Sequence, residues 1–156
     1  MFSMIGARLN FEGARVLDLY AGTGALGFEA LSRGAADVVF VEASLRAAHA
    51  LKANLLSLGL GSQVKLMVNN VDRIPGSQLA GRPFDLVVID PPYADVSSGA
   101  LTIALNRLFR DLVFSSNALL VLEHASRDAP PLIERWSLTE SRRHGDTTLS
   151  FYAPVA

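Results

Sequence analysis

Short apolar segments alternate with helix-like segments along the whole chain. The run from Val38 to Val41 has the length of a strand, whereas Leu51, Leu55 and Leu58 recur at the spacing of one helix face, with Ser44 placed to cap that helix. The pattern predicts strands at residues 14–19, 37–41, 64–68, 84–89 and 118–123. It predicts helices from the glycine-rich turn after residue 19 to residues 33–34, over 45–58 and over 100–110. This alternation is typical of an α/β domain with a mostly parallel sheet.

The end of the chain predicts a β-hairpin. Two extended segments, 136–143 and 147–152, are separated by His144-Gly145-Asp146, and this spacing suits a hairpin that closes the edge of the sheet. No repeat, low-complexity segment or linker divides the chain. We therefore expect residues 1–156 to form one doubly wound domain.

Composition narrows the class of protein. Of the 156 residues, 50% are hydrophobic and 19% are charged, a balance that excludes an intrinsically disordered chain. No apolar run approaches the roughly 18 residues that a membrane-spanning helix requires. Residues 1–5 contain no basic segment of the kind that opens a signal peptide. We expect a monomeric, cytoplasmic protein without a membrane partner.

Charge and metal-ligand content exclude further classes. The chain has no cysteine, so disulfides, thiolate nucleophiles and cysteine-based zinc sites are ruled out. The three histidines lie far apart in the sequence, and we expect no metal site. Because 14 basic residues face 15 acidic ones, any binding of nucleic acid would depend on a local patch rather than on net charge.

A glycine-rich turn follows the first predicted strand. In Asp18-Leu19-Tyr20-Ala21-Gly22-Thr23-Gly24-Ala25-Leu26-Gly27, the three glycines satisfy GxGxxG at a strand-to-helix junction. Such a turn lets the backbone approach a ligand and presents unpaired N–H groups of a helix, although it also occurs as a purely structural turn. Glu42 closes the second strand, where a carboxylate is either placed to accept both hydroxyls of a ribose or simply solvated.

Two cofactors fit this much of the pattern, a nicotinamide dinucleotide and S-adenosylmethionine. Asp18 separates them, because a carboxylate just before the glycines would repel a pyrophosphate. S-adenosylmethionine has no phosphate, and its amino-acid ammonium and its sulfonium both favour a nearby anion. The position of Asp18 therefore favours S-adenosylmethionine.

The fourth strand ends in Asp90-Pro91-Pro92-Tyr93. Two prolines remove two backbone donors, so we expect outward carbonyls without internal partners beside a carboxylate and an aromatic ring. An exocyclic amine of a nucleobase needs this combination, with its hydrogens on the Asp90 carboxylate and the Pro91 carbonyl and its ring stacked on Tyr93. Holding both hydrogens aims the nitrogen lone pair at a methyl donor. The alternative is a rigid turn after the strand.

These motifs together resemble a known family. The segments 16–27, 29–35, 40–42, 54–55, 84–86, 90–93 and 145–147 are similar to the bacterial methyltransferases that modify a guanine N2 in 16S ribosomal RNA of the small subunit. The resemblance covers nearly the whole chain and implies a class I, Rossmann-like methyltransferase fold with seven strands, the last antiparallel. It implies transfer of a methyl group from S-adenosylmethionine to guanine, with small-subunit RNA or the assembling subunit as partner.

The resemblance also implies the site residues. Asp90, Pro91, Pro92 and Tyr93 would form the catalytic turn. The cofactor would be held by Asp18, Tyr20, Ala21, Gly22, Thr23, Gly24, Gly27, Glu42, Ala43, Asn70, Val71 and Asp72. Among these, Glu42 would hold the ribose, Asp72 would lie by the adenine amino group and Val71 would donate from its backbone.

Contacts to RNA follow less directly from the sequence. Candidate phosphate ligands are Arg107, Arg110, Arg127, Arg135, Arg142 and Arg143. Of these we favour Arg142 and Arg143, because they lie beside the hairpin turn. Family members carry a basic segment ahead of the stretch that begins here at Phe2, and the resemblance implies that this segment helps to grip RNA. We expect weaker affinity for RNA without it, and we expect His144, where the family more often has tyrosine, to be a surface substitution.

Three alternatives remain open at this stage. The same turn chemistry would serve an adenine N6 or a protein amide. A small NAD-dependent oxidoreductase would share the glycine turn, and a non-catalytic module would bind cofactor or RNA without turnover. Glu123 and His124 end the fifth strand at the ligand-binding edge and are either site residues or a structural pair.

Overall fold

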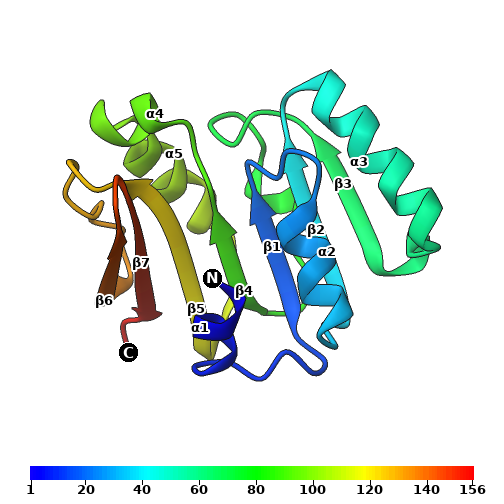
Figure 1. Ribbon diagram of the computed structural model, residues 1–156, viewed down its shortest axis with the longest axis horizontal. Coiled ribbons are helices and arrows are strands. Elements are labelled where there is room, and N and C mark those ends of the chain that lie inside the picture. The colour runs from blue at the N-terminus through cyan, green and yellow to red at the C-terminus, as the bar shows by residue number, and fades with distance from the viewer.

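A single seven-stranded sheet forms the centre of the molecule. The computed structural model describes residues 1–156, and the strand order is β3-β2-β1-β4-β5-β7-β6 (Figure 1). The strands are β1 Arg15–Leu19, β2 Asp37–Glu42, β3 Val64–Val68, β4 Phe84–Ile89, β5 Phe114–Ala125, β6 Trp136–His144 and β7 Thr147–Pro154. Strands β1 to β5 are parallel, and β7 lies antiparallel between β5 and β6. The predicted doubly wound sheet with an antiparallel C-terminal strand is confirmed.

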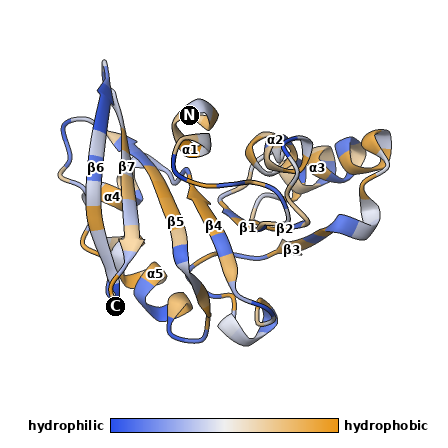
Figure 2. Ribbon diagram, turned by 90° about the horizontal axis from the view of Figure 1, so that it is seen from below, coloured by the Kyte–Doolittle hydropathy of each residue, from blue (hydrophilic) through white to orange (hydrophobic).

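Helices cover both faces of this sheet. They are α1 Phe2–Gly6, α2 Ala25–Ser32, α3 Leu45–Leu58, α4 Tyr93–Ser97 and α5 Ala100–Phe109, with short 3₁₀ turns at Gly61–Gln63 and Gly76–Gln78. Helices α1, α2 and α3 lie on one face, and α4 and α5 lie on the other (Figure 2). No helix is long and apolar enough to cross a membrane.

Alternation along the strands divides the core into two clusters. In β1, Val16 packs with the α1–α3 side, whereas Leu17 and Leu19 pack with the α4–α5 side. All five residues of β1 are buried, as expected for a central parallel strand covered on both faces. Because helices cover both faces of the sheet, a ligand is expected to bind at the ends of the strands.

The predicted helix ends are confirmed at α3. The Ser44 hydroxyl accepts a hydrogen bond from the Ala47 N–H at 3.2 Å, and Gly59 ends the helix with a left-handed φ of 68°. This helix carries Asn54, whose side-chain amide donates to the Thr23 carbonyl at 3.2 Å. A well-capped α3 therefore helps to hold the glycine-rich turn.

Several predicted bounds differ from the structure by one or two residues, and larger differences occur at β5, at the hairpin turn and at two short helices. Strand β5 begins at Phe114 rather than at residue 118. The polar residues Ser115, Ser116 and Asn117 hide this start in the sequence, whereas Phe114 pairs with Phe84 across a register shift in β4. The hairpin turn has two residues, Gly145 and Asp146, because His144 still pairs within β6. Helices α1 and α4 were not predicted, since five residues are too few for a periodic pattern.

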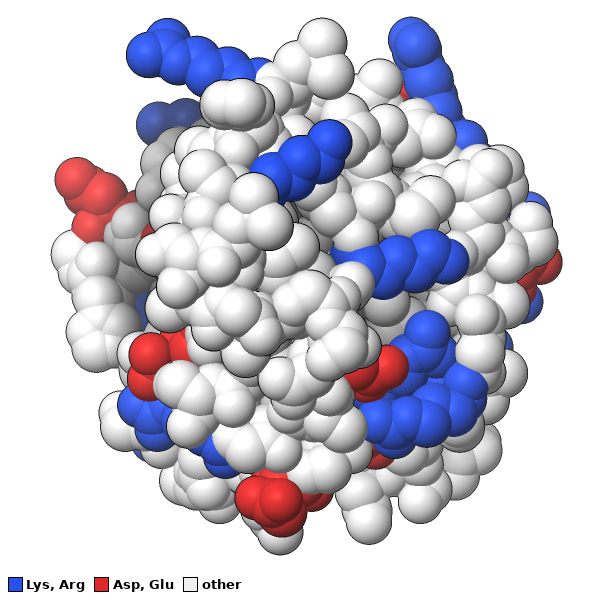
Figure 3. All heavy atoms as spheres, turned by 90° about the vertical axis from the view of Figure 1, so that its right-hand side faces the viewer, with Lys and Arg blue, Asp and Glu red and all other residues white.

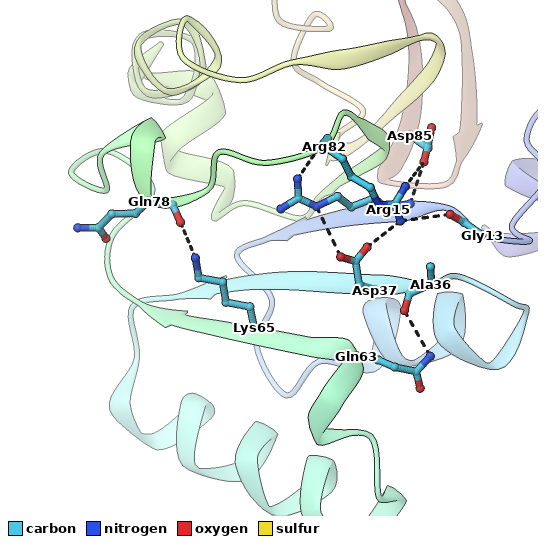
Figure 4. A network of polar contacts seen from close by, with 9 residues as sticks. All are labelled: Gly13, Arg15, Ala36, Asp37, Gln63, Lys65, Gln78, Arg82 and Asp85. Carbon is cyan, nitrogen blue, oxygen red and sulfur yellow. Dashed lines mark hydrogen bonds and ion pairs between the residues drawn. The ribbon is translucent and has the colours of Figure 1, made fainter.

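A polar network ties together the amino ends of the central strands (Figure 4). Arg15 donates its backbone N–H to Asp85 at 2.8 Å, and its guanidinium lies 4.2 Å above the Phe84 ring. Arg82 pairs with Asp37 at 3.2 Å. These contacts lie at the opposite edge of the sheet from the loops that follow β1, β2 and β4, so they fix the scaffold without occupying the site.

Candidate functional site

The carboxyl ends of β1, β2 and β3 open onto a pocket of about 230 Å³. It brings together the predicted residues Tyr20, Glu42, Ala43, Asn70, Val71 and Asp72. Its wall also includes Val41, Asn69, Asp95, Ala100 and Ala104, which were not predicted. Asp95 follows the proline turn by two residues, and the two alanines are four apart on α5, where small side chains leave room for a ligand.

The glycines of the turn have different structural reasons. Gly22 and Gly24 have φ values of 60° and 89°, in the left-handed region that favours glycine. Gly27 is required for packing instead, because a Cβ there would lie 2.3 Å from Cε1 of Phe40 in β2. Gly27 lies on the buried face of α2 against β2 and does not line the pocket. Gly27 was predicted to contact the cofactor, whereas in the structure it lies behind the residues that line the pocket.

Glu42 links the glycine turn to the start of α3. Its carboxylate accepts the Gly22 N–H at Oε1 and the Ser44 N–H at Oε2, both at 2.7 Å. Charge-assisted bonds of this kind hold the carboxylate in one orientation. Each oxygen retains a second lone pair, so Glu42 is still able to accept ribose hydroxyls while it braces the turn.

Asp18 lies beneath the same turn and is only 1% exposed. Its Oδ2 accepts the Gly27 N–H at 3.0 Å in the first turn of α2, and its other oxygen has no hydrogen-bond partner in the protein. Burial raises the pKa of Asp18 to about 8, with further increases from the charges of Asp90 and Glu42 and an opposing effect of the Gly27 bond. The protein alone therefore leaves this carboxylate without a cationic partner.

Replacing Asp18 with asparagine is expected to flatten the pH dependence of stability. The folded-state pKa of about 8 exceeds the ordinary value of 3.8, so the folded chain binds more protons between those pH values. The contribution of Asp18 to the free energy of unfolding is therefore full below pH 3.8 and is lost as the pH rises through about 8. Asparagine keeps an oxygen for the Gly27 N–H but does not titrate. Without cofactor, the melting temperature of the wild type should fall more steeply than that of Asp18→Asn between about pH 5 and about pH 8. Parallel curves of melting temperature against pH would contradict this.

Tyr20 adopts a strained backbone conformation at the end of β1. Its φ is 57°, a region that non-glycine residues rarely occupy. Burial, with the nearby charges of Asp95 and Asp72, raises the pKa of its hydroxyl to about 12. Strain of this kind persists where the surrounding structure demands it and is common at ligand sites. The hydroxyl is thus a neutral donor at the pocket wall.

The Asn70-Val71-Asp72 segment forms the far wall of the pocket. Arg107 of α5 donates to the Val71 carbonyl at 2.8 Å, whereas the Val71 N–H donates to no protein acceptor. Arg107 is therefore a brace for this wall, and its place as a candidate phosphate ligand stays a prediction. The free N–H agrees with a backbone donor toward a ligand.

The Asp90-Pro91-Pro92-Tyr93 turn lies at the carboxyl end of β4. The Pro91 carbonyl accepts no hydrogen bond, but the Pro92 carbonyl accepts the Asp95 N–H at 3.0 Å and opens α4. The expectation that both proline carbonyls are free is thus wrong for Pro92, because a helix starts at the next residue. Tyr93 is 41% exposed and its hydroxyl lies 3.1 Å from the Thr147 hydroxyl, which connects the turn to the hairpin.

Glu123 and His124, near the end of β5, lie in different environments. His124 is 1% exposed, with Nδ1 3.0 Å from the Ala125 carbonyl and Nε2 2.8 Å from the Ser150 hydroxyl. It is a satisfied structural residue. Glu123 is half-buried, and its pKa is raised by burial and by the charge of Asp90, with the Met1 amino group acting in the opposite direction. Only Glu123 of this pair belongs to the site region.

On the face that carries α3, most basic side chains stand apart from one another and do not form one large patch (Figure 3). Arg135 donates to the Phe109 carbonyl, and its place as a candidate phosphate ligand stays a prediction. Arg142 pairs with Glu140, and Arg143 Nε donates to the Gly145 carbonyl at 2.9 Å. Both are exposed on the edge strand, one on each of its faces, because they are adjacent in sequence.

Other parts of the surface lack the predicted residues. A larger, more open hollow of about 920 Å³ lies against the amino-terminal end of β5, lined by Arg8, Ser116, Thr139 and Glu140 among others. It contains none of the motif residues. No group of three or more histidine, cysteine, aspartate or glutamate side chains is placed to hold a metal ion.

The seven-stranded sheet with its antiparallel C-terminal strands is the class I, Rossmann-like methyltransferase fold. A magnesium protoporphyrin IX methyltransferase from Synechocystis, solved with bound SAM, shares the fold with a TM-score of 0.72 at 17% identity, over 98% of this chain and 76% of that one. The chain belongs to the family described as Conserved hypothetical protein 95, whose model matches residues 1–153.

Relatives agree with this class. Ribosomal RNA small subunit methyltransferase D of Haemophilus influenzae is 33% identical over 138 residues, which cover 87% of this chain and 69% of that protein. The solved structure of yhhF from Escherichia coli, a protein provisionally assigned as a methyltransferase, matches with a TM-score of 0.82 at 29% identity. That match covers 99% of this chain and 84% of the other. The chain is thus a methyltransferase.

Proposed function

We propose that this protein transfers a methyl group from S-adenosylmethionine to the exocyclic N2 amine of a guanine in small-subunit ribosomal RNA. The observation that carries the proposal is the pair of free acceptors at the end of β4, the Asp90 carboxylate and the Pro91 carbonyl, beside the pocket at the ends of β1–β3. The relative named as a small-subunit methyltransferase supports ribosomal RNA as the substrate. A ribosomal substrate implies a cytoplasmic reaction on free RNA or on the assembling subunit, and we propose a monomeric enzyme.

The residues present fit S-adenosylmethionine. Asp18 is a buried carboxylate with one unpartnered oxygen, which suits a cationic amino-acid tail and not a pyrophosphate. Glu42 would accept the ribose hydroxyls, and the Val71 N–H with the Asp72 carboxylate would face the adenine. The backbone of Ala21 to Gly24 would line the methionine part, which needs close approach and no side chains. Ala43 and Asn70 would complete the wall.

In the proposed reaction the protein mainly positions the two reactants and stabilises the developing charge. When bound, S-adenosylmethionine supplies a sulfonium methyl whose C–S bond breaks as the C–N bond to guanine forms, leaving S-adenosylhomocysteine. Asp90 and the Pro91 carbonyl orient the amine and stabilise the positive charge that develops on its nitrogen. Tyr93 supports the flat base, and Pro92 fixes the turn. The ammonium product is acidic enough to lose its proton to water afterwards, so no separate base is required.

Contacts to RNA are a separate part of the proposal. Arg142 and Arg143 lie beside the hairpin turn, which the Tyr93–Thr147 contact joins to the catalytic turn. We propose that they bind phosphates on either side of the edge strand. The Arg142 side chain is 58% exposed, so its ion pair with the half-buried Glu140 is weak and a phosphate is able to replace it at small cost.

Transfer of labelled methyl from S-adenosylmethionine tests the proposal. Unmethylated small ribosomal subunits, their extracted RNA, a DNA duplex and a protein extract are offered in parallel. Label on small-subunit RNA, free or assembled, is the expected result. Label on DNA or protein alone would replace the proposed substrate class, and bound cofactor with no transfer to any of them would indicate a non-catalytic module.

A further inference from the structure

Glu123 occupies the register position beside Asp90. Strands β4 and β5 are parallel neighbours in which Ile89 pairs with Leu122, so the next residues of the two strands are Asp90 and Glu123. Both lie at the carboxyl edge of the sheet, where the catalytic turn begins. Because side chains alternate along β5, Glu123 points to the opposite face from His124.

The end of β5 is held firmly enough to fix the place of Glu123. His124 is anchored by the Ala125 carbonyl on one ring nitrogen and by Ser150 on the other, at 3.0 and 2.8 Å. Glu123 itself pairs with Leu149 of β7 through the sheet. The Glu123 carboxylate therefore stands on a rigid strand end rather than on a mobile loop.

The two carboxylates are unpaired within the protein. Neither Asp90 nor Glu123 accepts a hydrogen bond or forms an ion pair with any side chain. Burial raises the pKa of both groups, and the charge of Asp90 raises that of Glu123 further. Because Asp90 is exposed and Glu123 is half-buried, both carboxylates are open to solvent and available to accept donors from a ligand.

Guanine and adenine differ in the hydrogen-bonding groups that they would present to two neighbouring acceptors. Guanine presents its N1–H directly beside the two hydrogens of its N2 amine, so all three positions are donors. Adenine presents an N1 lone pair beside its N6 amine, and a second carboxylate would repel it. The catalytic turn alone binds either amine, whereas a carboxylate beside it favours guanine.

We infer that Glu123 selects guanine, accepting the N1–H while Asp90 and the Pro91 carbonyl accept the amine hydrogens. The inference rests on the proposed function and names the residue that sets its base specificity. Glu123 contacts the substrate but does not touch the methyl group, so its effect falls on which base is accepted. A substrate edge that lacks the N1–H leaves the carboxylate facing a lone pair.

The test uses RNA in which the modified guanine, once located, is replaced by 2-aminopurine through ligation of synthetic segments. This base keeps the 2-amino group but has a lone pair at N1. The wild type should prefer guanine by at least about 100-fold in kcat/KM, as a site built for a donor rejects an analogue without it. Glu123→Gln, whose amide donates to a lone pair, should narrow that preference by about tenfold or more, and Glu123→Asp should retain most of it.

The controls separate the possible failures. Glu29→Gln makes the same change on the exposed surface of α2 and should leave the preference unaltered. Equal methylation of guanine and 2-aminopurine by the wild type would overturn the inference. An unchanged preference for guanine over 2-aminopurine in a folded Glu123→Gln protein would overturn it as well. If the wild type methylates no guanine in the unsubstituted RNA, the proposed function itself fails and the inference falls with it.

Discussion

Replacing Asp90 with alanine is expected to abolish most of the methyl transfer while leaving cofactor binding intact. The substitution removes the carboxylate that orients the amine and offsets its developing charge, an effect typically worth about 100- to 1000-fold in kcat. Asp90 is exposed and does not line the pocket proposed for the cofactor. Turnover and cofactor affinity should therefore separate, and label transfer with calorimetric titration of S-adenosylmethionine measures both.

Two further variants sharpen this result. Asp90→Asn retains one acceptor oxygen and should fall between the wild type and Asp90→Ala. Glu29→Ala removes an exposed carboxylate on α2 and should remain fully active. Unchanged turnover in Asp90→Ala would remove the proposed role of the catalytic turn.

Replacing Glu42 with alanine is expected to weaken binding of S-adenosylmethionine rather than the chemical step. The carboxylate accepts two backbone N–H groups at 2.7 Å, and its loss both frees the glycine turn and removes the acceptor for the ribose. Losing hydrogen bonds to a charged group costs about 1–3 kcal/mol, or about 5- to 150-fold in Kd. Calorimetric titration measures the change directly.

Melting temperatures identify any loss of folding in that variant. Glu42→Gln keeps one acceptor oxygen for either Gly22 or Ser44 and should lose less affinity than Glu42→Ala. A Kd equal to that of the wild type in Glu42→Ala would exclude the ribose assignment. A fall in kcat at saturating cofactor, with Kd unchanged, would move Glu42 from the cofactor to the substrate.

Much of the fold was predictable because local patterns and the final structure agree. Strands β3 and β4 have the predicted bounds, and Ser44 caps α3 as expected, since strand length and capping are short-range properties. The start of β5 was missed because its pairing across a register shift overrides the polar sequence there. Helix α1 depends on packing of Ile5 against the sheet, which no local pattern reveals.

The site was only partly predictable for the same reason. Motif residues fall together because parallel strands end at one edge, but motifs do not show which residues face the pocket. Asp95 and Ala104 line the pocket through the placement of α4 and α5, which the sequence does not specify. Two arginines show the same limit of the sequence. Their charge makes Arg107 and Arg135 candidates for phosphate binding, whereas the structure shows each donating to a backbone carbonyl.

The central claim is that the methyl group is placed on the N2 amine of a guanine. The most direct measurement is mass spectrometry of nucleosides from small-subunit RNA after reaction with the enzyme and labelled S-adenosylmethionine, with Asp90→Ala in parallel. The account predicts labelled N2-methylguanosine from one position and its absence with the variant. Labelled N6-methyladenosine, or label on any guanine atom other than N2, would contradict it.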